Sequence, residues 1–189
     1  MGSSPEVRDQ VQTVTLEAFA DTIVPGVKRS PDDRAIAGVC ADPGAVEAGA
    51  LELLAHPATG VAAGLAPLSQ ALNGHAAAYA ERHGRTLDGG VPPFVALSYE
   101  DRAALVVELT APGHPERDGW VLLALFSNMA YDSAAHRSTA EALAAGHPGL
   151  LAMGFAEPDA DGLWRFPDYS YGVVLAKRHP NTTASGSPE

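Results

Sequence analysis

The stretch WVLLALFSNMAY, residues 120–131, is the most apolar run of the chain and decides its fold class. Its polar side chains are too few to give a solvent-facing side, which is typical of a helix at the centre of a bundle. A transmembrane helix needs about 20 apolar residues, so this run is too short to span a membrane. We therefore expect a central core helix over about residues 118–131.

Apolar residues recur at helical spacing on the N-terminal side of this run. The first such stripe predicts a helix that ends at Pro25-Gly26, because proline blocks continuation and glycine tolerates the turn. A second stripe predicts a helix over about residues 61–83. The stripe residues are Leu16, Phe19, Ala20, Ile23 and Val24 in the first helix, and Leu65, Leu68, Leu72, Ala76 and Tyr79 in the second.

Capping signals place three shorter helices. Asp42 is the expected N-cap of a helix over about residues 45–55. Ser98 opens another helix, with Asp101 three residues on in the manner of a capping box. A last one covers residues 138–145. The chain shows no internal repeat and no convincing strand, so it predicts an all-α fold, a single irregular bundle of about six helices.

The chain length of 189 residues suits one domain with a sizeable core. We expect a flexible N-terminus over residues 1–13 and a helical domain over residues 14–180. The C-terminal part of that domain is a loop-rich aromatic segment. Residues 181–189, NTTASGSPE, are small and polar and predict a disordered tail.

The charge balance excludes several classes of partner. There are 23 acidic and 12 basic residues, which gives a formal net charge of −11. Nucleic acids and anionic membrane surfaces both attract basic faces, so neither is an expected partner. The acidity is compatible with solubility or with docking on a basic protein. The single cysteine, Cys40, excludes an intramolecular disulfide and fits a reducing compartment.

Aromatic side chains concentrate in residues 154–180. Trp and Tyr combine a large apolar area with a polar group, and they recur where one surface grips another. Two interpretations stay open: the rings pack onto the protein's own helices as a C-terminal flap, or they face a partner. The rings belong to Phe155, Trp164, Phe166, Tyr169 and Tyr171.

Hydroxyl, carboxylate and imidazole groups stand together at the end of the central helix, in Tyr131, Asp132, Ser133 and His136. A nucleophilic triad is usually assembled from distant segments, and the chain has no G-x-S-x-G elbow. Capping of the helix end is therefore the alternative interpretation of these residues.

The sequence predicts no metal site. His75 and His83 are eight residues apart on one expected helix, which is too far for a compact pair of ligands. Asp159, Asp161 and Asp168 suggest calcium, but the later glutamate of an EF-hand loop is missing. Glycine-rich phosphate loops of either common pattern are absent as well.

Four motifs along the chain form a recognisable set: LEAFADTIVPG at residues 16–26, PGA at 43–45, FSNMAY at 126–131 with the short helix up to Gly149, and WRFPDYSYG at 164–172. Together they resemble the gluconate 2-dehydrogenase subunit 3 family, and more narrowly its small actinobacterial relatives that accompany glucose-methanol-choline (GMC)-type flavin oxidoreductases. The resemblance covers about residues 14–180.

The resemblance implies a non-catalytic small subunit that binds and stabilises a larger FAD-dependent GMC-type oxidoreductase. Such a subunit carries neither flavin nor haem, and FAD is expected in the partner. The aromatic residues Trp164, Phe166, Tyr169 and Tyr171 are then the expected partner-binding residues. Members of that family often carry a twin-arginine export signal, whereas residues 1–14 hold one arginine, Arg8, and no apolar run. We therefore expect a cytoplasmic complex.

The alternative function is a stand-alone, cofactor-free enzyme of secondary metabolism, of lyase or cyclase type, acting in an apolar pocket between helices. Its candidate catalytic residues are His75, Tyr131, Asp132, His136 and Asp168. A scaffold that binds a small apolar ligand is a third hypothesis.

Overall fold

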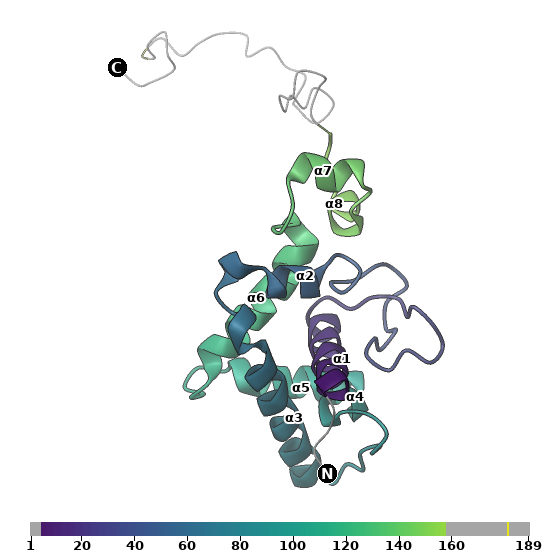
Figure 1. The fold of residues 1–189 in the computed structure, drawn as a ribbon, viewed down its shortest axis with the longest axis vertical. Helices are drawn as coiled ribbons and strands as arrows, with labels where there is room; N and C mark the ends of the chain where they lie inside the picture. Colours follow the sequence, from purple (N-terminus) through teal and green to yellow (C-terminus); the bar gives the residue numbers. More distant parts are fainter. Residues whose placement is uncertain (1–4, 158–180, 182–189) are drawn as a thin grey trace. The chain divides into compact units, whose positions relative to one another are not determined.

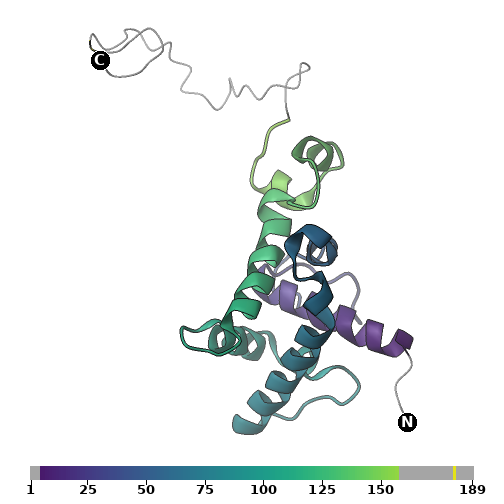
Figure 2. The same ribbon diagram turned by 60° about the vertical axis from the view of Figure 1, so that its left-hand side comes forward.

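The computed structural model describes residues 5–157 and residue 181 (Figures 1 and 2). The chain divides into two units, Met1–Phe155 and Ala156–Glu189, and every helix named below belongs to the first unit. The helices are α1 (Pro5–Ile23), α2 (Ala50–Ala55), α3 (Leu65–Arg82), α4 (Pro93–Ala96), α5 (Tyr99–Thr110), α6 (Arg117–Ser133), α7 (Thr139–Ala144) and α8 (Pro148–Ala152), with the 3-10 turns η1 (Pro57–Thr59) and η2 (Ala62–Gly64) between α2 and α3.

The all-α class is confirmed for the described residues, which form helices, turns and loops but no strand. This part of the chain has eight α-helices instead of about six. The two that the sequence analysis missed, α4 and α8, contain four and five residues. An apolar stripe needs several turns to become visible, so periodicity does not reveal helices of one turn.

Helix α1 is central in the first unit and contacts α2, α3, α4, α5 and α6 (Figures 1 and 2). Its stripe residues Leu16 and Phe19 are buried as predicted. The ring of Phe19 lies between those of Phe94 and Trp120, with centroid distances of 6.2 and 6.4 Å. Since Phe94 belongs to α4 and Trp120 to α6, these three rings join three helices in one core.

The predicted central helix is α6, which packs against α1, α2, α5 and α8. Its core position is confirmed, because Trp120, Leu123 and Ala130 are fully buried. The expectation that it lacks a solvent-facing side is wrong, since Leu122 and Leu125 are exposed. Helix α6 therefore packs on one side and presents leucines on the other.

Helix α1 starts earlier than expected. Residues 5–13, which were expected to be a flexible N-terminus, form its first turns. Most of the described side chains of these turns are exposed. Helix propagation beyond a packed segment adds one hydrogen bond for each residue that is fixed, so the helix extends past its buried half.

Helix α2 starts later than expected, at Ala50 instead of about residue 45. Gly49 has φ 89°, in the left-handed region, so the helix does not extend through it. The prediction that Asp42 is its N-cap is therefore wrong. The carbonyl of Asp42 instead accepts a hydrogen bond from Val27 N at 2.9 Å.

The predicted N-cap of α5 is confirmed, because Ser98 Oγ accepts a hydrogen bond from Asp101 N at 3.2 Å. Ser138 caps α7 in the same way, through Glu141 N at 3.4 Å. Within residues 5–157, no helix combines the length and the hydropathy that a membrane span requires.

Candidate functional site

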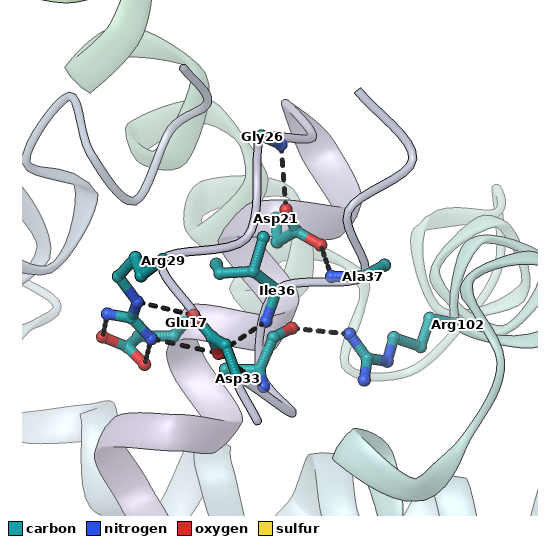
Figure 3. Close-up of polar contacts among 9 residues, drawn as sticks. Glu17, Asp21, Gly26, Arg29, Asp33, Ile36, Ala37 and Arg102 are labelled. Atoms are coloured by element: carbon teal, nitrogen blue, oxygen red, sulfur yellow. Dashed lines mark hydrogen bonds and ion pairs between the residues drawn. The ribbon is translucent and has the colours of Figure 1, made fainter. Parts of the chain in front are cut away.

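The loop of residues 24–44, between α1 and α2, is fixed from inside by Asp21 (Figure 3). This residue of the last turn of α1 is only 1% exposed. Its Oδ1 accepts a hydrogen bond from Gly26 N at 3.0 Å, and its Oδ2 accepts one from Ala37 N at 2.8 Å. Burial raises the pKa of Asp21 above its usual value, against the opposing effect of these two hydrogen bonds. One carboxylate thus ties two distant points of the loop to α1.

Arg102 of α5 holds the same loop from its other side. The residue is 3% exposed, and burial lowers its pKa. Its guanidinium donates four hydrogen bonds of 2.6 to 3.1 Å, all of them to backbone carbonyl groups. The acceptors are Arg34 and Ala35 in the loop and Phe94 and Val95 in α4. Arg102 therefore joins the loop to α4.

A second arginine ties the outer side of the loop to α1. The guanidinium of Arg29 donates two hydrogen bonds to Glu17, of 2.6 and 2.7 Å, and one to Asp33 Oδ2 at 2.7 Å. Its hydrogen bonds to Glu17 and Asp33 raise the pKa of Arg29. Burial alone would raise the pKa of Asp33, but hydrogen bonds from Arg29 and from Ile36 N lower it below its usual value.

Two glycines of the motifs that resemble the subunit 3 family meet in this loop. A Cβ atom on Gly26 would lie 2.6 Å from Gly44 N, and one on Gly44 would lie 2.6 Å from Gly26 N and from Val24 O. Only glycine permits such a close approach of two backbone segments. Ala45 N closes the loop by donating to Val24 O at 3.0 Å. These motif residues thus have a structural role in fixing the loop.

The fixed loop forms one wall of a pocket of about 570 Å³. The N-terminal half of α1 and residues 90–95 form the others. The loop contributes the charged residues Arg29, Asp32, Asp33 and Arg34, and the apolar lining includes five valines, Val7, Val11, Val14, Val91 and Val95. Val7 and Val11 are 46% and 39% exposed, so α1 presents part of an apolar stripe at the surface.

The structure does not bring the predicted catalytic residues into one site. His75 of α3 contacts Glu116, directly before α6, with 2.6 Å between Nε2 and Oε2. Tyr131 and Asp132 lie in the last turns of α6, about 23 Å from Glu116 along the helix axis at 1.5 Å per residue. Asp132 there accepts a hydrogen bond from Asn128 Nδ2 at 2.7 Å. None of the described candidates lines the 570 Å³ pocket.

The side chain of His136 is 4% exposed and packs against Gly49. Its Nε2 lies 3.3 Å from Glu52 Oε2. Neither ring nitrogen makes a hydrogen bond of regular geometry with a described residue. Burial lowers the pKa of His136. The hydroxyl of Ser133 donates to Met129 O at 2.9 Å, which supports a role of that residue in the helix end and not in a triad with His136.

Several predicted site residues lie outside the described residues. They are the catalytic candidate Asp168 and the partner-binding candidates Trp164, Phe166, Tyr169 and Tyr171. Both interpretations of the aromatic segment therefore stay predictions.

The polar contacts described above involve residues that were not predicted as site residues, among them Arg102, Asp21 and Glu116. Arg102 carried a visible signal, because it stands three residues before Leu105 and so interrupts the apolar face of α5 with a charge. Asp21 is one of the motif residues, but its hydrogen-bond partners depend on the path of the loop. Glu116 follows a proline in a short loop, and nothing in the sequence pairs it with His75.

A comparison with family models decides the membership of the chain, because one model matches residues 10–189. The chain belongs to a family of unknown function, DUF5987. The match extends over the first unit from within α1 and over the C-terminal aromatic segment. No curated protein and no solved structure matches the chain. The resemblance to gluconate 2-dehydrogenase subunit 3 therefore stays a prediction.

Proposed function

We propose that this protein is a non-catalytic binding subunit that associates with a larger FAD-dependent oxidoreductase of GMC type. The observation that carries the proposal is the 570 Å³ pocket between α1, the fixed loop and residues 90–95. The motif resemblance to gluconate 2-dehydrogenase subunit 3 supports the class of the partner.

The apolar stripe of α1 supports a binding role. Val7, Val11 and Val14 follow each other at intervals of four and three residues, so they share one face of the helix. Exposed apolar side chains that line a concavity are typical of a surface that another molecule covers. A volume of 570 Å³ admits large side chains, such as the anchors that dominate protein interfaces.

The rigidity of the pocket wall supports the same role. Asp21, Arg102 and Arg29 hold the loop with hydrogen bonds of 2.6 to 3.3 Å. Arg34 adds an ion pair of 3.0 Å to Asp88, which connects the loop to the segment before residues 90–95. A surface that is already ordered loses less conformational entropy on binding. The charged groups at its rim then favour one partner over others.

In this complex, FAD belongs to the partner, and this chain carries no cofactor of the reaction. The proposed location of the complex is the cytoplasm. A second contact with the partner, in addition to the pocket, comes from Trp164, Phe166, Tyr169 and Tyr171.

A small apolar ligand is the second candidate occupant. The valine lining and the volume of the pocket favour it, because binding sites for small molecules commonly have 300 to 1,000 Å³, about the size found here. No observation on the described residues favours the lyase or cyclase alternative, whose described candidates lie away from this pocket.

The pocket is tested by placing a charge in its lining. Val11→Glu is expected to abolish co-purification with a co-expressed GMC-type flavoprotein, because an unpaired carboxylate becomes buried in the interface. Val107→Glu on α5 is the matched control, since Val107 is 69% exposed and does not line the pocket. Circular dichroism verifies that both variants fold. A Val11→Glu variant that still co-purifies would exclude the pocket as the contact, and ligand binding without a partner would favour the second candidate.

A further inference from the structure

Three side chains of metal-binding type meet beside the N-terminus of α6. His75 comes from the middle of α3, His114 from the loop between α5 and α6, and Glu116 directly precedes α6. One ligand atom of each residue lies within 4.8 Å of the other two. The ring centroids of the two histidines are 5.7 Å apart. Because α3 and the loop are far apart in the sequence, the fold itself assembles this group.

A buried indole completes the surroundings of the group. Trp120 is fully buried, and its Nε1 has no hydrogen bond of regular geometry among the described residues. The indole lies edge-on to the ring of His75, at a centroid distance of 5.8 Å. The indole therefore forms an apolar wall on the inner side of the group, and an apolar surround limits the access of water to a bound ion.

We propose that His75, His114 and Glu116 bind a divalent transition-metal ion, with Zn²⁺ as the expected species. Two imidazoles and one carboxylate form a common ligand set of Zn²⁺ sites that keep a fourth position open. Mg²⁺ and Ca²⁺ prefer oxygen ligands, so two imidazoles select against them.

Binding of Zn²⁺ by these three residues requires only side-chain movement. Ligand atoms around tetrahedral Zn²⁺ are about 3.4 Å apart, given bond lengths near 2.1 Å. The His75–Glu116 separation of 2.6 Å has to lengthen, and any separation in the group above about 3.4 Å has to shorten, by less than about 1.5 Å because all lie within 4.8 Å. The side chains of His75 and Glu116 are 33% and 49% exposed, so both have room to rotate.

His114 is held next to Glu116 by a hydrogen bond that ion binding has to open. Its Nδ1 accepts a hydrogen bond from Glu116 N at 3.2 Å. A neutral imidazole that accepts at Nδ1 carries its proton on Nε2, so ligation through either nitrogen requires that this bond opens. A surface ion pair between His75 and Glu116 does not by itself bring a third ligand type, the His114 imidazole, within 4.8 Å of both.

Isothermal titration of the untagged full-length chain with Zn²⁺ tests the site, with Co²⁺ absorption as a second readout of coordination. We expect one ion per chain and a tetrahedral Co²⁺ spectrum. The variants His75→Ala, His114→Ala and Glu116→Gln are each expected to weaken Zn²⁺ binding at least about tenfold. His56→Ala is the matched control, because His56 is an exposed histidine that caps η1.

His114 lies in a loop, so its variant keeps the fold if the loss of His75 disturbs α3. The proposal is overturned if the wild-type chain binds no Zn²⁺ in the micromolar range, or if the three variants bind as the wild type does. Equal weakening by His56→Ala would show non-specific surface binding and would overturn it as well.

Discussion

Arg102 is a buried cation whose partners are backbone carbonyl groups instead of a carboxylate at contact distance. Each of its four hydrogen bonds satisfies a carbonyl group of the loop or of α4. A buried acceptor that loses its donor costs about 1–3 kcal/mol of stability. Arg102 is therefore the single side chain on which the attachment of the loop to α4 depends most.

We expect Arg102→Met to lower the free energy of unfolding by at least about 3 kcal/mol, because several buried carbonyl groups lose their donor at once. Urea denaturation followed by circular dichroism measures the change. Arg82→Met is the control: Arg82 forms an exposed pair with Glu108, so its loss costs less than about 1 kcal/mol. Equal effects of the two substitutions would contradict the role given to Arg102.

Asp33 makes stability depend on pH in a defined direction. Its folded pKa lies below the unfolded value of 3.8, so its contribution is fully present above that value. It is lost as the pH falls through the folded pKa. We expect Asp33→Asn to lower the unfolding free energy at neutral pH, and the difference from the wild type to shrink as the medium becomes more acidic than pH 3.8.

Urea denaturation of both proteins across this acidic range measures the difference. Asp32→Asn serves as control, because Asp32 is the exposed neighbour of Asp33 and makes no hydrogen bond of that kind to Arg29. If the difference in unfolding free energy between the wild type and Asp33→Asn stayed constant on acidification, the proposed coupling of Asp33 to Arg29 would be refuted.

At the scale of elements, the close approach of Gly26 and Gly44 keeps the loop against the end of α1. A Cβ atom at Gly44 would meet backbone atoms at 2.6 Å, and backbone cannot rotate away as a side chain does. We expect Gly44→Ala to lower the unfolding free energy by about 1–3 kcal/mol. Thermal unfolding of the variant measures this change.

Gly74 offers the matched control, because it lies within α3 and a Cβ atom there would meet nothing within 4 Å. Gly74→Ala is expected to stabilise the protein by about 0.5–1 kcal/mol, since alanine favours a helix over glycine. If Gly44→Ala were also stabilising, the close packing of the loop would be refuted.

The helices with stripes over several turns were predictable from the sequence. Helices α1, α3, α5 and α6 each contribute buried apolar residues to the core, although Leu125 of α6 is exposed. The short helices α4 and α8 were not predictable, because one turn carries too little periodic signal. The shift of α2 follows from the left-handed Gly49, whose φ depends on the turn before it.

The polar sites were less predictable, because their partners are distant in the sequence. Arg102 donates hydrogen bonds to Ala35 and Arg34, which precede it in the sequence by 67 and 68 positions. His75 contacts Glu116 across 41 positions. Spacing along the chain carries no information on such pairs. Tyr131, Asp132 and His136 were recognisable as a group because they are close together in the sequence. In the structure, Asp132 and His136 have separate contacts.

At the scale of the whole molecule, the aromatic segment should act in partner binding and not in the core of the first unit. The double variant Trp164→Ala and Phe166→Ala is expected to lose co-purification with a GMC-type flavoprotein, because large rings supply much of the energy at interfaces. Its thermal unfolding should match that of the wild type. A double variant that fails to fold, or that unfolds at a lower temperature than the wild type, would assign these rings to the protein's own core.

The central claim is that this chain is a binding subunit of a flavoprotein. The most direct test is size-exclusion chromatography of the chain co-expressed with a GMC-type oxidoreductase encoded beside its gene, recording protein and flavin absorbance together. The account predicts one yellow complex that contains both chains, and a colourless chain when the partner is left out. A chain that elutes alone beside the flavoprotein would contradict the account.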